Sequence, residues 1–285
     1  MKRIFTALCI LALTAAQGVF AADAATSKAQ AAIADAAKKI QEEPADSDAI
    51  NVYMRACIQQ FNALVKSDRK AAQRLINDMK ETFRAVKTKD EKAANLLPRA
   101  VAHLTKMESG IETAQKRDAM IGKDAAPLNL EEWINGAPLS NDDLKGKVVL
   151  LDFWAVWCGP CIATFPHLRE WREEFSKDGL VIIGLTRPDN YTWDDAKKRA
   201  SRSKEKLTTE QRHEMLGKFA EHHKLEHPFA IQPDRKLSQY YHVSGIPHVV
   251  IIDRKGKIRL MKVGSGPDSA KAIEAMIKKL IKEDA

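Results

Sequence analysis

Two cysteines stand three positions apart in Cys158-Gly159-Pro160-Cys161, directly after the apolar run 148–155. A run this long and apolar is typical of a strand buried in a sheet, so the cysteines should lie where the strand ends and the next helix begins. The unpaired N–H groups and positive dipole end of that helix would favour a thiolate at Cys158, the nucleophile of disulfide exchange. Cys161, one turn later, could then attack the mixed disulfide and release the reduced substrate.

A CxxC pair can also be half of a zinc site, which needs two further ligands. Neither Cys9 nor Cys57 has a ligand partner two to four residues away. Imidazoles at near-helical spacing suggest a second metal hypothesis, but no carboxylate or cysteine is placed to complete that ligand set. These imidazoles belong to His213, His222, His223 and His227. The sequence therefore favours redox chemistry and predicts no metal ion.

The residues around the pair strongly resemble thioredoxin. The resemblance rests on the runs Asp152-Phe153-Trp154-Ala155-Val156-Trp157 and Ser244-Gly245-Ile246-Pro247. Three further runs make the chain similar to the TlpA-like branch of exported thioredoxins, related to the redoxins: Leu144-Lys145-Gly146-Lys147, Phe165-Pro166 and the segment 251–258. The resemblance covers residues 119–285 and implies an α/β thioredoxin fold with an N-terminal hairpin. Protein disulfides would be the substrates, and no cofactor is implied.

The resemblance also implies roles for single residues. Cys158 resembles the exposed attacking cysteine and Cys161 the buried resolving one. Pro247 matches the cis-proline that faces the CxxC motif, where the backbone with Ile246 would pair with a substrate chain as a short strand. Trp157 would form an apolar platform beside Cys158, with simple packing as the alternative.

Asp152 matches the buried acid beneath the thioredoxin active site. Burial would raise its proton affinity, as a base that takes the proton from Cys161 requires. Thr164 stands where TlpA-like proteins often carry Glu, so the acid–base arrangement looks closer to thioredoxin itself. However, the strand 181–184 lacks the lysine that accompanies the acid in thioredoxin. Gly159-Pro160 contributes no side chain that would strongly stabilise a thiolate, which favours a reducing couple and a reductase.

Two other functions share this scaffold. A thiol peroxidase would need Thr or Ser three residues before the attacking cysteine, and Ala155 occupies that position. A copper-handling or cytochrome-assembly module would need a third ligand, for which His248 is the candidate.

The N-terminus indicates export. Met1-Lys2-Arg3 is basic, residues 4–16 are apolar but too short to span a bilayer, and small residues precede a cut near Ala21. We expect a signal peptide over 1–21 and a periplasmic protein, recharged by a membrane thiol reductant of the DsbD type. The chain has 46 basic and 38 acidic residues, which are mixed along its length. It lacks the dense basic patch interleaved with aromatic residues that nucleic-acid binding would need, so we expect no nucleic-acid partner.

Residues 22–118 are predicted to form a separate all-α domain before the thioredoxin-like domain 119–285. The segment is rich in Ala, Lys, Glu and Gln, and apolar residues recur at helical spacing, which predicts three or four helices. Pro98 would open or bend one of them. The domain could form a homo-oligomer, dock a partner or cover the redox site. Cys57 lies on an apolar stripe, which indicates a buried thiol or, alternatively, an intermolecular disulfide.

The spacing after residue 119 predicts short segments punctuated by turns and then alternating strands and helices. A helical insertion is expected at 187–224, where basic residues gather. The expected elements are a strand at 148–154, a redox helix from 158 to 175, a strand at 180–185, a helix near 208–223, strands at 229–232, 247–253 and 257–263, and a helix from 268.

Overall fold

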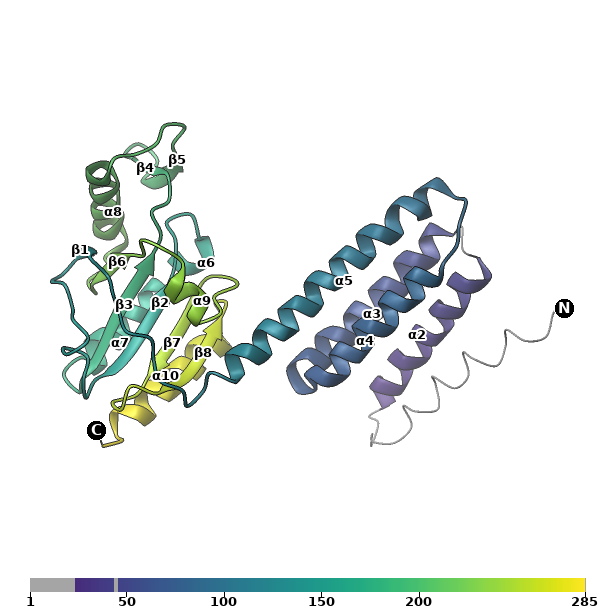
Figure 1. The fold of residues 1–285 in the computed structure, drawn as a ribbon, viewed down its shortest axis with the longest axis horizontal. Helices are drawn as coiled ribbons and strands as arrows, with labels where there is room; N and C mark the ends of the chain where they lie inside the picture. The colour runs from purple at the N-terminus through teal and green to yellow at the C-terminus, as the bar shows by residue number, and fades with distance from the viewer. Residues whose placement is uncertain (1–23, 44–45, 285) are drawn as a thin grey trace. The chain divides into compact units, whose positions relative to one another are not determined.

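The computed structural model describes residues 24–43 and 46–284, and the signal peptide expected at 1–21 lies outside these residues. The chain forms two compact units, one ending at Glu112 and the other comprising Thr113–Ala285 (Figure 1). None of the helices in this described part is long and apolar enough to cross a membrane.

The described residues of the first unit form four helices: α2 (Ala24–Glu42), α3 (Ser47–Ser67), α4 (Arg69–Ala85) and α5 (Glu91–Asp118), the last of which continues into the second unit. Local capping explains two of the helix starts. The side chain of Asp46 accepts the N–H groups of Asp48 and Ala49, and that of Asp68 accepts the N–H of Ala71. Pro98 lies inside α5 rather than at its start.

The helices of this unit bury their apolar stripes in a core of their own. Large members of the core are Ile40, Ile50, Phe61, Ile76, Phe83 and Leu104. Cys57 belongs to this core as a free, fully buried thiol, and burial raises its pKa to about 12. The burial expected for Cys57 is therefore confirmed.

A six-stranded mixed sheet forms the centre of the second unit, in the order β1-β6-β3-β2-β7-β8. The strands β2, β3 and β6 are parallel, whereas β7, β8 and β1 join antiparallel. Their bounds are β1 (Glu132–Asn135), β2 (Val148–Phe153), β3 (Leu180–Thr186), β6 (Phe229–Ile231), β7 (His248–Ile252) and β8 (Ile258–Val263). This order and the helices that connect the strands are the thioredoxin fold.

The alternation of side chains along β2 divides the core into two clusters. Val148 and Leu150 pack with both cysteines and with α7 (Phe165–Phe175) and α10 (Pro267–Ile281). Val149, Leu151 and Phe153 lie in the other cluster. Asp152 alternates with the first set, so its side chain belongs to the same face of the sheet as the cysteines.

Three expected elements differ from the structure. The N-terminal hairpin is instead the single strand β1, because Glu132 pairs with Ile231 of the distant β6 rather than with a neighbouring segment. The redox helix is broken into α6 (Gly159–Ile162) and α7: Ala163 is the C-cap of α6, Thr164 is the N-cap of α7, and Pro166 lies in the first turn of α7, where proline is tolerated.

The helical insertion is confirmed only in its second half. Residues 187–206 contain a hairpin, β4 (Tyr191–Asp194) and β5 (Arg199–Arg202), and α8 (Thr209–His223) follows with a capping box between Thr208 and Gln211. The hairpin forms because Tyr191, Trp193 and Ala200 pack against the core at alternating positions, a strand period rather than a helical one. The strands after it, β6 to β8, lie where they were expected.

Candidate active site

The cysteine pair occupies the point where β2 ends and α6 begins. The two sulfur atoms are joined in a disulfide with an S–S distance of 2.06 Å. Cys158 is the N-cap residue of α6, and its Sγ accepts the N–H of Cys161 at 3.2 Å. The backbone of the helix start therefore directs a donor at the sulfur of Cys158, which stabilises negative charge there when the disulfide opens.

The two cysteines differ less in exposure than we expected. Cys158 is only 4% exposed and Cys161 is fully buried, whereas the neighbouring Trp157 is 47% exposed. The expectation of an openly exposed Cys158 is thus wrong for the disulfide form, because its Sγ is bonded to Cys161 within the core cluster. Gly159 and Pro160 remain exposed and form the surface over the pair.

Trp157 is held by a residue that sequence analysis did not identify. Its indole Nε1 donates a hydrogen bond to Asp189 Oδ2 at 2.7 Å. Asp189 lies in the loop after β3, so the ring beside Cys158 is tied to the segment that leads into the β4–β5 hairpin. The only signal in the sequence was an acid shortly after a buried strand.

The peptide bond between Ile246 and Pro247 is cis, as predicted. Pro247 precedes β7, whose His248 pairs with Phe153 at the end of β2, so this turn lies at the cysteine end of the sheet. The carbonyl of Pro247 accepts the N–H of Gly264 at 2.8 Å. No hydrogen bond to the backbone of Ile246 is found within the described part of the chain.

Asp152 is buried directly below this end of the sheet. Neither carboxylate oxygen has a hydrogen-bond partner among the described residues, and burial alone raises the pKa to about 7. Its partner on β3 is Gly184, which carries no side chain where a lysine could have stabilised the charged form. The predicted rise in proton affinity is confirmed, and at neutral pH the carboxyl group can both take up and release a proton.

Gly184 has no room for a side chain, because Phe229 and Trp154 pack closely against its backbone. A Cβ at this position would lie 2.7 Å from Phe229 Cβ and 2.8 Å from Trp154 Nε1. The indole of Trp154 stacks on Phe219 with ring centroids 5.3 Å apart. The absent side chain thus makes room for the aromatic cluster behind the cysteines.

The histidines do not gather into a metal site. Within residues 24–43 and 46–284, no three His, Cys, Asp or Glu side chains could together hold an ion. His213 contacts Glu132, while His227 is buried without a hydrogen-bond partner in the described structure. His248 packs against Phe153 at 5.7 Å between ring centroids, on the face of the sheet away from the cysteine cluster, so the structure does not bring it to Cys158 as a third copper ligand.

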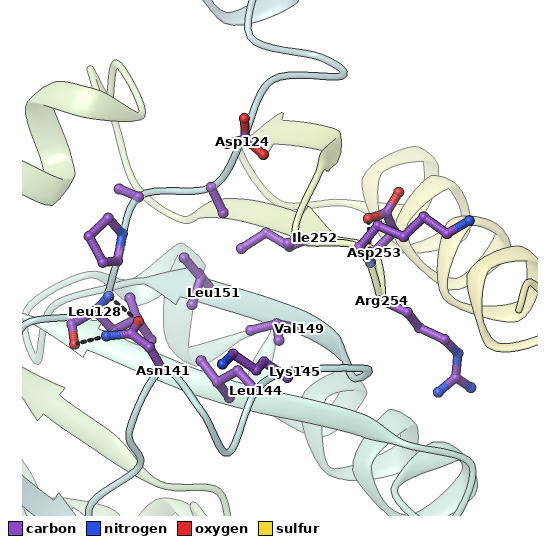
Figure 2. Close-up of a pocket in the computed structure, with 15 residues that line it drawn as sticks. Asp124, Leu128, Asn141, Leu144, Lys145, Val149, Leu151, Ile252, Asp253 and Arg254 are labelled. Atoms are coloured by element: carbon purple, nitrogen blue, oxygen red, sulfur yellow. Dashed lines mark hydrogen bonds between the residues drawn. The ribbon is translucent and has the colours of Figure 1, made fainter. Parts of the chain in front are cut away.

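A pocket of about 400 Å³ lies away from the cysteines, at the opposite end of β2 (Figure 2). Its floor is apolar, formed by Leu128, Val149, Leu151 and Ile252. Asn141 spans one wall by hydrogen bonds to the N–H and carbonyl of Leu128, so its amide is already occupied. The pocket holds no group that could join the chemistry of the cysteines.

The second unit is similar to known proteins over most of its length. Residues 121–261 match the AhpC/TSA family. The thiol-disulfide oxidoreductase ResA of Bacillus thuringiensis is 28% identical over 167 residues, which cover 59% of this chain and 82% of that protein. The thiol:disulfide interchange protein HelX of Rhodobacter capsulatus is 28% identical over 141 residues, 49% and 66% of the two chains. A thiol-disulfide isomerase from Corynebacterium glutamicum is a structural neighbour with 23% identity and a TM-score of 0.43, covering 56% of this chain and 97% of that one.

Proposed function

Because the chain belongs, through residues 121–261, to the thioredoxin-like AhpC/TSA family, we propose that this thiol-disulfide oxidoreductase is exported and reduces protein disulfides through Cys158 and Cys161. The observation that carries the proposal is the Cys158–Cys161 disulfide with Cys158 as the N-cap of α6. A bonded pair at this place can exist in a dithiol and a disulfide form, and the helix start favours thiolate at the first sulfur.

In the reduced protein, the Cys158 thiolate attacks one sulfur of the client disulfide. A mixed disulfide forms, and the other client sulfur leaves as a thiolate that takes up a proton. Cys161 gives its proton to Asp152 and attacks the Cys158 sulfur, which releases the second client thiol. The client gains two electrons and two protons: its second sulfur takes the proton that Asp152 received from Cys161, and its first sulfur takes one from the solvent, which had received the proton of Cys158. The protein ends as the Cys158–Cys161 disulfide.

The client chain would bind across the cis-proline turn and Trp157. The backbone of Ile246, without a hydrogen bond in the described structure, can pair with an extended client segment. Trp157 offers an apolar surface beside the attacking sulfur. Both features lie at the end of the sheet that carries Cys158, so one extended segment can reach them together.

Each catalytic cycle leaves an oxidised protein that must be reduced again. We propose that the electrons come from a membrane thiol reductant of the DsbD type, since the expected compartment is the periplasm. N-terminal sequencing of the protein from a periplasmic extract tests the export step, with a mature chain that begins near Ala22 as the expected result. A full-length chain in the cytoplasm would contradict export.

Three cysteine variants test the oxidoreductase mechanism by insulin reduction. Cys158→Ser should abolish the activity, and Cys161→Ala should accumulate client joined to Cys158, because no thiol remains to resolve the mixed disulfide. Cys57→Ala is the matched control, since Cys57 is buried in the helical unit, and it should retain the wild-type rate. Wild-type activity in Cys158→Ser would overturn the mechanism.

For residues 22–118 we propose a separate domain with a role in assembly or docking. Its helices have their own core, and no group of potential ligands or catalytic side chains gathers in the part described. The homo-oligomer remains a prediction that light scattering on the full-length protein tests. A mass that is a multiple of one mature chain would support it, and the mass of one chain would contradict it.

A further inference from the structure

The segment 187–206, which follows β3, is basic. It contains seven Lys or Arg residues and four Asp or Glu residues. Three of the four acids are engaged: Asp194 pairs with Lys197 at 3.0 Å, Asp195 with Lys198 at 3.9 Å, and Asp189 accepts the hydrogen bond from Trp157. The remaining acid, Glu205, forms no ion pair within the described structure, so the segment keeps an excess of positive charge.

Five cations of the segment are exposed and form no ion pair or side-chain hydrogen bond within the described structure. They are Arg187, Arg199, Arg202, Lys204 and Lys206. Elsewhere in the unit many cations have a carboxylate nearby, as Arg259 has in Asp253 and Glu283. The positive charge of this segment is therefore available to an outside partner.

Hydrogen bonds hold the base of the hairpin close to the cysteines. Asn190 Nδ2 donates to the carbonyls of Ser203 at 3.1 Å and Glu205 at 2.7 Å, and Asn190 Oδ1 accepts the N–H of Leu207 at 3.0 Å. Asn190 follows Asp189, which holds the Trp157 ring beside Cys158. The hairpin thus rises at the end of the sheet where α6 begins (Figure 1).

The hairpin is also anchored from below. Trp193 packs edge-on against Phe219 of α8, with ring centroids 6.3 Å apart, and Tyr191 and Ala200 contact the same core. Arg202 thus lies on a strand that packs against the core, and the loop that carries Lys204 and Lys206 is held by the hydrogen bonds of Asn190 to the carbonyls of Ser203 and Glu205. A fixed charge costs less ordering entropy when a partner binds.

We infer that Arg187, Arg202, Lys204 and Lys206, here called the basic rim, bind an acidic segment of the client chain beside its disulfide. The inference rests on the proposed function and deepens it, since it names the chemistry of the preferred client. Unpaired charges at the rim of a binding site raise the rate of encounter with a partner of opposite charge and suppress partners of like charge. The protein would therefore select disulfides flanked by Asp and Glu.

Two synthetic peptides can test this preference with the full-length reduced protein. They share one intramolecular disulfide loop, flanked by three Glu in one peptide and by three Lys in the other. We expect kcat/KM for the Glu peptide to exceed that for the Lys peptide by roughly tenfold at low salt, and the ratio to approach one at about 1 M salt. The variant Arg202→Gln/Lys204→Gln/Lys206→Gln should reduce the low-salt ratio to roughly two.

The matched control removes the same number of charges from the other end of the sheet. Lys255, Lys279 and Lys282 are exposed there, near the turn that Arg254 ties to the carbonyl of Ile281. The triple Gln variant of these lysines should keep the wild-type ratio. An equal loss in both triple variants would overturn the inference, because the preference would then follow net charge.

Two further outcomes separate the inference from its alternatives. Equal kcat/KM for both peptides, together with binding of the wild type but not the rim variant to phosphatidylglycerol vesicles, would overturn it in favour of a membrane surface. Failure of the wild-type protein to reduce either peptide or the small neutral bis(hydroxyethyl) disulfide would instead overturn the proposed oxidoreductase function itself.

Discussion

The indole of Trp157 and the carboxylate of Asp189 are joined by a 2.7 Å hydrogen bond, which connects the residue before Cys158 to the loop after β3. A large side chain that is 47% exposed would otherwise sample several rotamers. The hydrogen bond to a carboxylate holds the ring in one orientation beside the disulfide. The proposed client platform is thus organised before a client arrives, which lowers the ordering cost of binding.

Asp189→Ala should therefore weaken client binding more than the chemical steps. We expect the KM for insulin reduction to rise roughly threefold with kcat nearly unchanged, as the loss of one partly exposed hydrogen bond implies. Asp142→Ala, at the opposite end of the sheet and in an exposed pair with Lys145, is the control and should change neither constant. A fall in kcat with constant KM would contradict a positioning role for Asp189.

Asp152 should make the stability of the protein depend on pH in an unusual direction. The folded protein keeps the proton up to about pH 7, whereas an Asp in the unfolded chain loses it near 3.8. Between these values the folded state binds more protons, so the free energy of unfolding contributed by this group falls as the pH rises. The loss is complete above pH 7 and is on the order of 4 kcal/mol.

Asp152→Asn removes this titration and keeps the shape of the side chain. Urea unfolding at pH 8 should show a more stable variant, and the gain should shrink as the pH falls toward 4. Insulin reduction should slow in the same variant, since no carboxyl group takes the proton from Cys161. A stability difference that does not vary with pH would show that Asp152 does not titrate as its burial implies.

Much of the cysteine end could be predicted because its signals are local. The apolar run before the cysteines defines β2, and burial in that run is what raises the proton affinity of Asp152. By contrast, the hydrogen bond between Trp157 and Asp189 joins residues 32 positions apart, and no periodicity records such a pair. The hairpin was not predicted because β4 and β5 have only four residues each and are joined by a charged turn. The pairing of strand β1 was not predicted because its partner β6 follows about a hundred residues later in the chain.

Gly184→Ala should destabilise the second unit although the change adds a single methyl group. The new Cβ would lie under 3 Å from Phe229 Cβ and Trp154 Nε1, which are both held in the aromatic cluster. Overpacking of this kind costs about 1–3 kcal/mol, which urea unfolding can measure. Gly217→Ala in α8 is the matched control, because nothing lies within 4 Å of its Cβ position. In a helix interior that change should stabilise by about 0.5–1 kcal/mol, and equal effects of both substitutions would contradict the packing argument.

The separate core of the helical unit leads to a prediction about how the protein unfolds. Ile76 is fully buried in that core, so Ile76→Ala should cost about 2–5 kcal/mol. If the cores are independent, far-ultraviolet circular dichroism in urea should show the helical transition moving to lower urea, while insulin reduction is lost at the same urea concentration as in the wild type. Val52→Ala, at an exposed position of α3, should change stability by less than about 0.5 kcal/mol. A parallel loss of activity and helical signal in Ile76→Ala would instead mean that the thioredoxin-like domain needs the helices in order to stay folded.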